Sequence, residues 1–181
     1  ARRVAQHVDR LAALAHALDP AAEPPGQHGA GILARMRVRA LDEVSGAPGY
    51  AFLKADICDF DMMAWAFGDF RPDAVMHLAA ESHVDRSISG PDAFIETNVV
   101  GTHALLKAAR QVWILEGQCA AHRLHHISTD EVFGSLEADD PAFAESNQYQ
   151  PNSPYSASKA ASDHLVRAYL HTYGLQVTTS N

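Results

Sequence analysis

From Tyr50 onward, short apolar runs alternate with longer stretches of helical character, and no other feature constrains the fold as strongly. This alternation is typical of βαβ units, in which helices pack against a parallel sheet. Strands are expected over 50–55, 74–78, 124–128 and 175–179, and helices over 59–67, 91–115 and 153–173. The sequence therefore predicts an α/β fold with a doubly wound parallel sheet, whose loops meet at the carboxyl ends of the strands.

The ends of these elements carry their own signals. Asp59 suits the N-cap position of the first helix, and Pro91 suits the first turn of the second. Gly174 follows the third helix in the C′ position, where its freedom to adopt a positive φ ends the helix. The stretch 137–151 is polar and rich in turn-forming residues, so we expect a surface loop there.

Charge and cysteine content exclude several classes of protein. The 181-residue chain has a formal net charge of -8, whereas a nucleic-acid-binding protein needs a basic face to neutralise phosphates. Its two cysteines, Cys58 and Cys119, form no CxxC pair, so we expect no disulfide framework, no zinc site and a cytoplasmic location. The apolar runs are shorter than the roughly 20 residues that span a bilayer, so no membrane segment is expected.

The histidines near the third strand raise the question of a metal site. His122 and His126 share one face of that strand, while His125 points to the other. No cysteine or carboxylate completes a ligand geometry with them. We therefore expect core or surface histidines and no metal.

The segment that opens the third helix carries a tyrosine and a lysine four residues apart, Tyr155 and Lys159. One helical turn separates them, so both side chains project from the same face. An ammonium beside a phenol favours the phenolate and lowers the pKa of the tyrosine from about 10, which makes Tyr155 usable as a base. The same spacing also occurs by chance on many helices.

A polar segment follows the strand 124–128. Ser128 and Thr129 supply hydroxyls, and Asp130 and Glu131 supply adjacent carboxylates at the edge where such sheets bind ligands. The alternative is an acidic turn that ends at Gly134. The interval between this strand end and the Tyr155 helix is the one that a βα unit needs, which favours an active site.

Four blocks of the chain resemble one family. They are DAVMHLAAESHVDRS over 73–87, FIETNVVGT over 94–102, STDEV over 128–132 and SPYSASK over 153–159. The chain resembles, over about 41–181, the dTDP-glucose 4,6-dehydratases of the extended short-chain dehydrogenase/reductase superfamily. Phe133 stands where that family usually has Tyr.

The resemblance implies a reaction in which NAD takes a hydride from sugar C4, water leaves across C5 and C6, and the hydride returns to C6. Tyr155 is then the base for the C4 hydroxyl, and Lys159 lowers its pKa and touches the nicotinamide ribose. Thr129 bonds the same C4 oxygen. Glu131 removes the C5 proton, and Asp130 protonates the departing C6 hydroxyl. Related epimerases and decarboxylases usually lack the Asp-Glu pair, and GDP-mannose dehydratases have Ser in place of the Asp.

Further positions match the family's binding residues. The implied NAD contacts are Asp56, Ile57, Leu78, Ala79, Ala80, Ser82, Thr97, Ser128, Tyr155 and Lys159, and the implied substrate contacts are Ser82 and Thr129. Ordinary strand-end packing is the alternative for 78–80, and a hydroxyl bonded to its own helix backbone is the alternative for Thr97.

The first 45 residues depart from a dinucleotide-binding fold, which opens with a strand, a Gly-rich turn and a helix. Gly26, Gly29 and Gly31 instead follow a Pro-Pro pair. We expect an atypical segment over 1–45 in place of the Gly-rich βαβ start, and a partial NAD-binding Rossmann-like domain over 46–181.

The chain starts without Met and stops within an expected strand, so we expect a fragment that lacks the C-terminal substrate domain and is inactive alone. The complete protein is expected to convert dTDP-glucose to dTDP-4-keto-6-deoxyglucose. By resemblance it forms a homodimer through the helices 91–115 and 153–173. The alternatives are another NAD-dependent sugar-nucleotide epimerase or dehydratase, or a non-catalytic NAD-binding relic.

Overall fold

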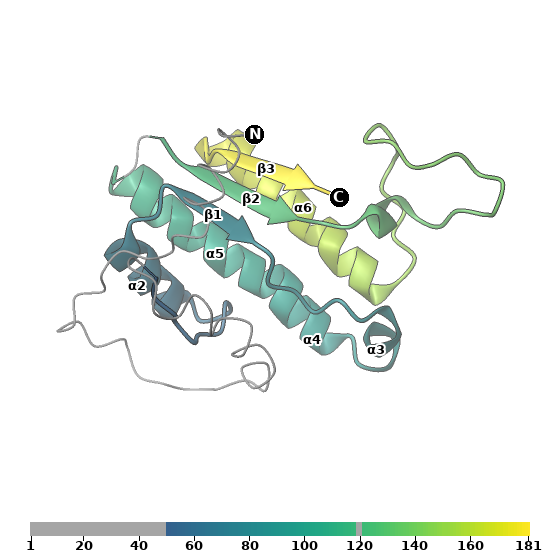
Figure 1. Ribbon diagram of the computed structural model, residues 1–181, viewed down its shortest axis with the longest axis horizontal. Coiled ribbons are helices and arrows are strands. Elements are labelled where there is room, and N and C mark those ends of the chain that lie inside the picture. Colours follow the sequence, from purple (N-terminus) through teal and green to yellow (C-terminus); the bar gives the residue numbers. More distant parts are fainter. Residues whose placement is uncertain (1–49, 119–120) are drawn as a thin grey trace.

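The computed structural model describes residues 50–118 and 121–181 (Figure 1). The predictions for 1–45, including the glycine string from Gly26 to Gly31, lie outside the described residues. The helices and strands are α2 (Phe60–Phe70), β1 (Ala74–His77), α3 (Val84–Ser89), α4 (Asp92–Phe94), η3 (Ile95–Gly101), α5 (Thr102–Ala109), η4 (Arg110–Leu115), β2 (Arg123–Ile127), η5 (Asp130–Phe133), α6 (Pro154–Tyr173) and β3 (Val177–Ser180).

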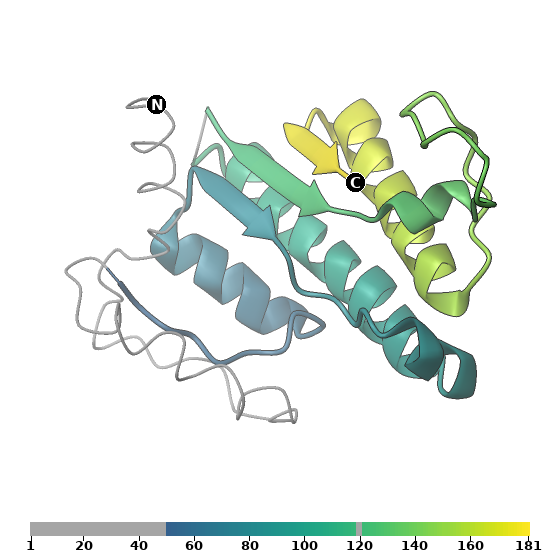
Figure 2. The same ribbon diagram turned by 45° about the vertical axis from the view of Figure 1, so that its right-hand side comes forward.

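The three described strands form a parallel sheet in the order β1-β2-β3. Leu124 of the central strand pairs in register with Val75 on one side and with Val177 on the other. All three arrows point the same way, so the loops that follow β1 and β2 leave the sheet at one edge (Figure 2). The predicted parallel α/β fold is confirmed.

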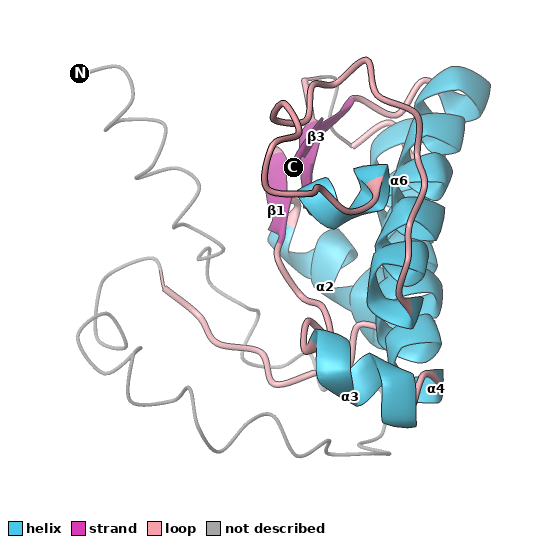
Figure 3. Cartoon of the chain, turned by 90° about the vertical axis from the view of Figure 1, so that its right-hand side faces the viewer, coloured by secondary structure: helices cyan, strands magenta, loops and turns pink. Residues whose placement is uncertain are grey.

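The helices of the described residues lie on one side of this sheet (Figure 3). Leu106 and Leu124 are fully buried between the layers, and burial of such a side chain contributes about 1.5–3 kcal/mol. The core between α2, α5, η4, α6 and the sheet includes Met62, Met63, Phe67, Val75, Leu105, Leu106, Ala109, Val112, Trp113, Leu124, Val166 and Leu175. The chain therefore supplies one helical layer of the doubly wound arrangement in its described part.

The predicted helix ends are confirmed by their hydrogen bonds. Asp59 caps α2, since its carboxylate accepts from the backbone N–H of Met62 at 3.0 Å. Ser153 caps α6 in a reciprocal pair with Ser156, and Pro154 takes the first turn. Gly174 ends α6 with φ at 73°, a left-handed conformation that glycine adopts without steric cost.

The predicted helix over 91–115 is present as a succession of α4, η3, α5 and η4 without a break. Two of these four, η3 and η4, are π-helical. An inserted residue widens the turn in a π-helix, and such turns are frequent at functional sites. Thr97 and Asn98 lie within η3.

The sequence predictions and the structure can also be compared for one strand, two short helices and one loop. The strand expected over 50–55 is wrong, because these residues are extended but no described strand lies beside them to form a ladder. The short helices α3 and η5 were not predicted. The loop over 137–151 is confirmed, since it contains turns and bends but no helix or strand.

In the described part of the chain, no helix is both long enough and apolar enough to cross a membrane.

Candidate active site

The site is built at the carboxyl edge of the sheet. The parallel strands β1 and β2 end side by side, with His77 paired to His126 in register. The segment 78–83 follows β1 and the segment 128–131 follows β2, so both leave the sheet at this edge (Figure 2). Helix α6 begins at Pro154 on the helical side of the same edge.

The end of β2 gathers one hydroxyl and two carboxylates. Thr129 is the N-cap of η5, and its hydroxyl accepts from the backbone N–H of Glu131 at 3.3 Å. The same hydroxyl lies 3.5 Å from carboxylate oxygens of both Asp130 and Glu131. Asp130 is exposed, whereas Glu131 is half-buried. The two neighbouring carboxylates therefore have different surroundings.

Tyr155 stands in the first turn of α6 and faces this group. Its side chain is buried, and its hydroxyl forms a hydrogen bond with Thr129. Burial raises the pKa of Tyr155, the bond with Thr129 opposes that shift, and the charges of Glu131 and Asp130 add to it. The structure therefore brings together Thr129, Asp130, Glu131 and Tyr155, as the sequence predicted.

The ammonium of Lys159 is bonded to the backbone in this structure, and its effect on the phenol stays a prediction. Lys159 is 4% exposed and its ammonium donates to the carbonyl oxygen of Ile127 at 2.6 Å. Burial lowers the pKa of Lys159, and the neighbouring Asp163 partly offsets that shift. The pKa of Tyr155 is raised rather than lowered, because burial and the carboxylates near it oppose the phenolate.

The residues matched to cofactor contacts lie around a second feature, a cavity of about 330 Å³ between the segment 51–57, α2 and β1. Ile57, Leu78 and Ala79 line it, and most of its other lining side chains are apolar. Asp56 is exposed beside this cavity, and its carboxylate accepts from the backbone N–H of Cys58 at 2.9 Å.

The remaining predicted positions do not line this cavity. Ala80 is half-buried and Ser82 is exposed in the segment between β1 and α3. Thr97 is half-buried on η3. Ser128 does not face the cavity, because its hydroxyl donates to a carboxylate oxygen of Asp163 at 2.5 Å.

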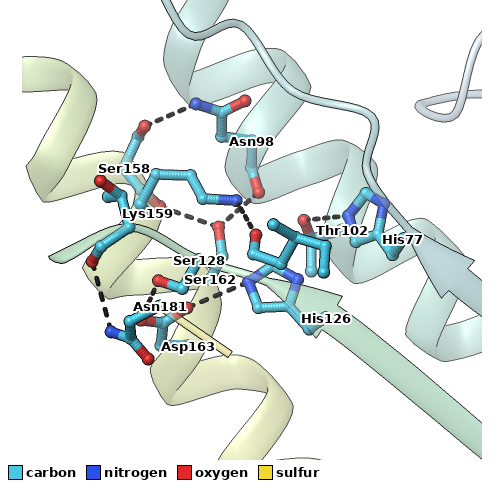
Figure 4. Close-up of polar contacts among 12 residues, drawn as sticks. His77, Asn98, Thr102, His126, Ser128, Ser158, Lys159, Ser162, Asp163 and Asn181 are labelled. Atoms are coloured by element: carbon cyan, nitrogen blue, oxygen red, sulfur yellow. Dashed lines mark hydrogen bonds and ion pairs between the residues drawn. The ribbon is translucent and has the colours of Figure 1, made fainter. Parts of the chain in front are cut away.

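Sequence reasoning missed a buried polar network beneath the site (Figure 4). Asp163 accepts from Ser128 and contacts Nε2 of His126 at 3.0 Å. Asn98 joins η3 to α6 through Ser158 at 2.8 Å and holds the backbone of Glu81 through two further bonds. One signal was available, because Asp163 follows Lys159 by four residues and so projects from the same helix face.

His77 belongs to the same network. Its Nε2 lies 2.9 Å from the hydroxyl of Thr102, and its ring lies 5.3 Å from that of His126. Burial, followed by the charges of His126 and Lys159, lowers the pKa of His77 to about 3. The described residues contain no group of three or more His, Cys, Asp or Glu side chains that could hold a metal ion.

Comparison with known proteins places this geometry in a family. The family model described as GDP-mannose 4,6 dehydratase matches residues 31–181. The chain belongs to this family. The resemblance found in the sequence is thereby confirmed at the level of the family.

Characterised relatives in this family share more than half of the aligned residues. A dTDP-glucose 4,6-dehydratase of Haemophilus influenzae is 56% identical over 144 residues, which cover 78% of this chain and 43% of the relative. A dTDP-glucose 4,6-dehydratase of Escherichia coli K12 is 55% identical over 152 residues, 78% of this chain and 42% of the relative. The chain thus spans about two-fifths of the length of these relatives.

Solved structures show the same likeness. DesIV, a dTDP-glucose 4,6-dehydratase of Streptomyces venezuelae with NAD bound, has a TM-score of 0.69 and 46% identity over 78% of this chain and 41% of its own. A UDP-glucose 4-epimerase of Thermus thermophilus in complex with NAD has a TM-score of 0.64 and 33% identity over 72% of this chain and 40% of its own. The Rossmann-like fold predicted from the sequence is confirmed.

Proposed function

We propose that the full-length protein carrying this sequence is an NAD-dependent sugar-nucleotide dehydratase that converts dTDP-glucose to dTDP-4-keto-6-deoxyglucose. The observation that carries the proposal is the convergence of Thr129, Asp130 and Glu131 on the buried hydroxyl of Tyr155. An elimination next to a carbinol carbon needs a base for the hydroxyl, a base for the carbon acid and an acid for the leaving group. This group of side chains supplies all three.

Tyr155, Glu131 and Asp130 each carry out one proton transfer. Tyr155 accepts the proton of the sugar C4 hydroxyl, while the hydroxyl of Thr129 holds the same oxygen in place. Glu131 removes the proton at C5, which the new C4 ketone makes acidic, and Asp130 delivers a proton to the departing C6 hydroxyl.

NAD is the proposed cofactor, and its nicotinamide would accept the C4 hydrogen with its electron pair in the first step and return it to C6 in the last. The cavity of about 330 Å³ supports the adenine end, because apolar Ile57 and the backbone of Leu78 and Ala79 line it. The exposed Asp56 and Ser82 and the half-buried Thr97 would supply polar atoms for the rest of the cofactor. Lys159, one turn after Tyr155 on α6, would hold a ribose hydroxyl in exchange for its bond to the carbonyl of Ile127.

The choice among sugar nucleotides depends on the Asp130–Glu131 pair. The solved relatives include a UDP-glucose 4-epimerase. An epimerase needs the hydride-transfer step but no acid for a leaving hydroxyl. Two carboxylates at the end of β2, beside Tyr155, therefore favour elimination over epimerisation.

We also propose that the full-length protein is a homodimer that pairs through the segment 91–115 and α6. The exposed apolar side chains Ile95, Val100 and Tyr173 on these helices support a covered surface. Size-exclusion chromatography with light scattering tests this arrangement, and a strictly monomeric full-length protein contradicts it.

The test of function is an assay of the full-length protein with dTDP-glucose and NAD, which follows the 4-keto-6-deoxy product. Tyr155→Phe and Glu131→Gln are each expected to lower kcat by about 10²–10⁴-fold, the usual contribution of a positioned acid or base. Glu145→Gln removes an exposed carboxylate from the loop and serves as the matched control. Turnover of UDP-glucose to UDP-galactose without dehydration would instead establish an epimerase, and NAD binding without any turnover would establish a non-catalytic module.

A further inference from the structure

We propose that Asp163 is the positioning residue of this site. Its carboxylate ties the end of β2 and the loop 134–153 to α6, and so holds Thr129, Asp130 and Glu131 opposite Tyr155. The proposal rests on the proposed function, which assigns no role to Asp163. It concerns a side chain that touches neither substrate nor cofactor in that scheme.

Three donors from three segments converge on this one carboxylate. Oδ2 accepts from the hydroxyl of Ser128, which follows β2, at 2.5 Å. It also accepts from the hydroxyl of Tyr149, in the loop, at 2.9 Å. Oδ1 lies 3.0 Å from Nε2 of His126, on β2 itself. Asp163 is only 5% exposed, so these bonds replace the water that would otherwise solvate its charge. Figure 4 shows the contacts with Ser128 and His126.

His126 acts as a donor in this arrangement. It is fully buried, and its Nδ1 has no hydrogen-bond partner among the described residues. An unpaired buried N–H costs more than an unpaired nitrogen lone pair when the other ring nitrogen faces a carboxylate. Nε2 therefore carries the proton that lies between the ring and Asp163.

The contacts of Asp163 reach the reacting groups within one or two residues. Ser128 directly precedes Thr129, and Tyr149 directly precedes Gln150, whose backbone N–H donates to the carbonyl of Val132 in η5 at 2.9 Å. On α6, Asp163 follows Lys159 by one turn and Tyr155 by two. The carboxylate of Asp163 thus holds the end of β2 and η5 in a fixed position relative to Tyr155 on α6.

The charge of Asp163 also acts on the two titratable groups of α6. It raises the pKa of Tyr155 and that of Lys159, in each case as a smaller effect than burial. The other charged or titratable groups around Tyr155 are Asp130 and Glu131 on η5, and those around Asp163 are His126 on β2 and Tyr149 in the loop. Loss of the negative charge at Asp163 therefore lowers the pKa of Tyr155.

A purely structural role predicts different behaviour. A buried carboxylate that only stabilises the fold, once removed, reduces the free energy of unfolding but leaves the pH profile and the local order of η5 unchanged in the folded protein. Two substitutions separate geometry from charge. Asp163→Asn keeps the shape, and the hydroxyls of Ser128 and Tyr149 can reverse to suit an amide, whereas Asp163→Ala removes both the contacts and the charge.

The experiment uses full-length protein with the three variants Asp163→Asn, Asp163→Ala and, as matched control, Asp61→Asn on the exposed side of α2. Asp163→Ala is expected to lower kcat about 10²-fold with little change in KM, the cost of misplaced catalytic groups. Asp163→Asn is expected to recover a large part of that loss, and the acidic limb of its kcat/KM profile should move to lower pH. Asp61→Asn should match the unchanged protein in every respect.

Two readouts do not depend on turnover. NMR of ¹³C-labelled tyrosine follows the titration of Tyr155, assigned with Tyr155→Phe, and hydrogen exchange follows the amides of η5. Asp163→Asn should lower the Tyr155 midpoint, and Asp163→Ala should speed exchange in η5 about tenfold or more. A protein without dehydratase activity overturns the proposed function, while these two readouts still decide the role of Asp163. Folded Asp163 variants with an unchanged Tyr155 midpoint and unchanged η5 exchange overturn the positioning role.

Discussion

The ammonium nitrogen of Lys159 lies 2.6 Å from the carbonyl oxygen of Ile127, the last residue of β2. This bond crosses from α6 to the strand end and is shielded from water, since Lys159 is 4% exposed. A charged donor on a buried carbonyl contributes more than a neutral one. Lys159 thus ties helix to sheet beside Tyr155 in addition to any contact with a cofactor.

Removal of this ammonium should therefore destabilise the protein itself. Lys159→Met keeps most of the side-chain volume but leaves the carbonyl of Ile127 without its donor, at a cost of about 1–3 kcal/mol in the free energy of unfolding. Urea denaturation measures the change. Lys54→Met, which removes an exposed lysine, is the control and should change stability by less than about 0.5 kcal/mol. Equal values for the two variants would show that the buried bond adds nothing to stability.

His77 should make the protein sensitive to acid. Burial, His126 and Lys159 lower its pKa to about 3, whereas an unfolded histidine titrates near its usual 6.5. Below pH 6.5 the unfolded chain therefore binds a proton that the folded chain excludes. The stability that the folded protein gains from keeping His77 unprotonated is fully present above pH 6.5. It is lost as pH falls toward 3, and the free energy of unfolding then falls by up to about 1.4 kcal/mol per pH unit.

His77→Gln removes this titration, and an amide can still bond the hydroxyl of Thr102. Urea denaturation at intervals between pH 4 and pH 8 should show a shallower acid loss in this variant than in the unchanged protein. His171→Gln alters an exposed histidine on α6 and should leave the slope as it is. Identical slopes in all three proteins would mean that His77 takes up its proton without unfolding.

The parts of the fold that the sequence predicted are those whose signals are local. Asp59 and Gly174 act through bonds within their own turns, so these helix ends could be placed without knowledge of the tertiary structure. The strand expected at 50–55 failed for the opposite reason. A strand needs a partner, and its own residues contain no information about whether one lies beside it.

The candidate site divides in the same way. Thr129, Asp130 and Glu131 are neighbours in sequence, and Tyr155 and Lys159 are one turn apart, so each group was visible as a motif. Asp163 became visible only when the fold brought three donors to its carboxylate. The direction of the pKa shift of Tyr155 was missed because burial, its largest cause, depends on the packing of the whole edge.

Asn98 should be a strong determinant of stability although it reaches no reacting group in the proposed scheme. It is 1% exposed, its amide donates to the carbonyl of Glu81 and to Ser158, and its carbonyl accepts from the backbone N–H of Glu81. Asn98→Leu leaves these buried groups unpaired and is expected to cost about 2–4 kcal/mol. Asn147→Leu, in the exposed loop, should cost under about 1 kcal/mol in the same urea titration, because water replaces its lost contact. A loss at Asn98 no larger than at Asn147 would contradict this account.

Gly101 offers a test of the cofactor side of the site. A Cβ atom at this position would lie 2.5 Å from Cδ1 and 2.6 Å from Cγ1 of Ile57, closer than real Cβ contacts allow. Gly101→Ala must therefore turn or displace Ile57, which lines the cavity proposed for adenine. The helical Gly68 has nothing within 4 Å of an added Cβ, so Gly68→Ala is a matched glycine-to-alanine change without a clash.

Alanine has the higher helix propensity, so Gly68→Ala should stabilise the protein by about 0.5–1 kcal/mol and leave NAD affinity unchanged. Gly101→Ala should stabilise the protein less than Gly68→Ala does, or destabilise it. It should also weaken NAD binding to the full-length protein about tenfold, which is about 1.4 kcal/mol of binding free energy. Isothermal titration calorimetry measures this affinity. In the double variant Gly101→Ala/Ile57→Ala the clashing atoms are absent. Its loss in the free energy of unfolding should therefore be smaller than the sum of the losses in the two single variants. Unchanged NAD affinity in Gly101→Ala would place the adenine away from Ile57, because a displaced side chain in contact with the base cannot leave its binding untouched.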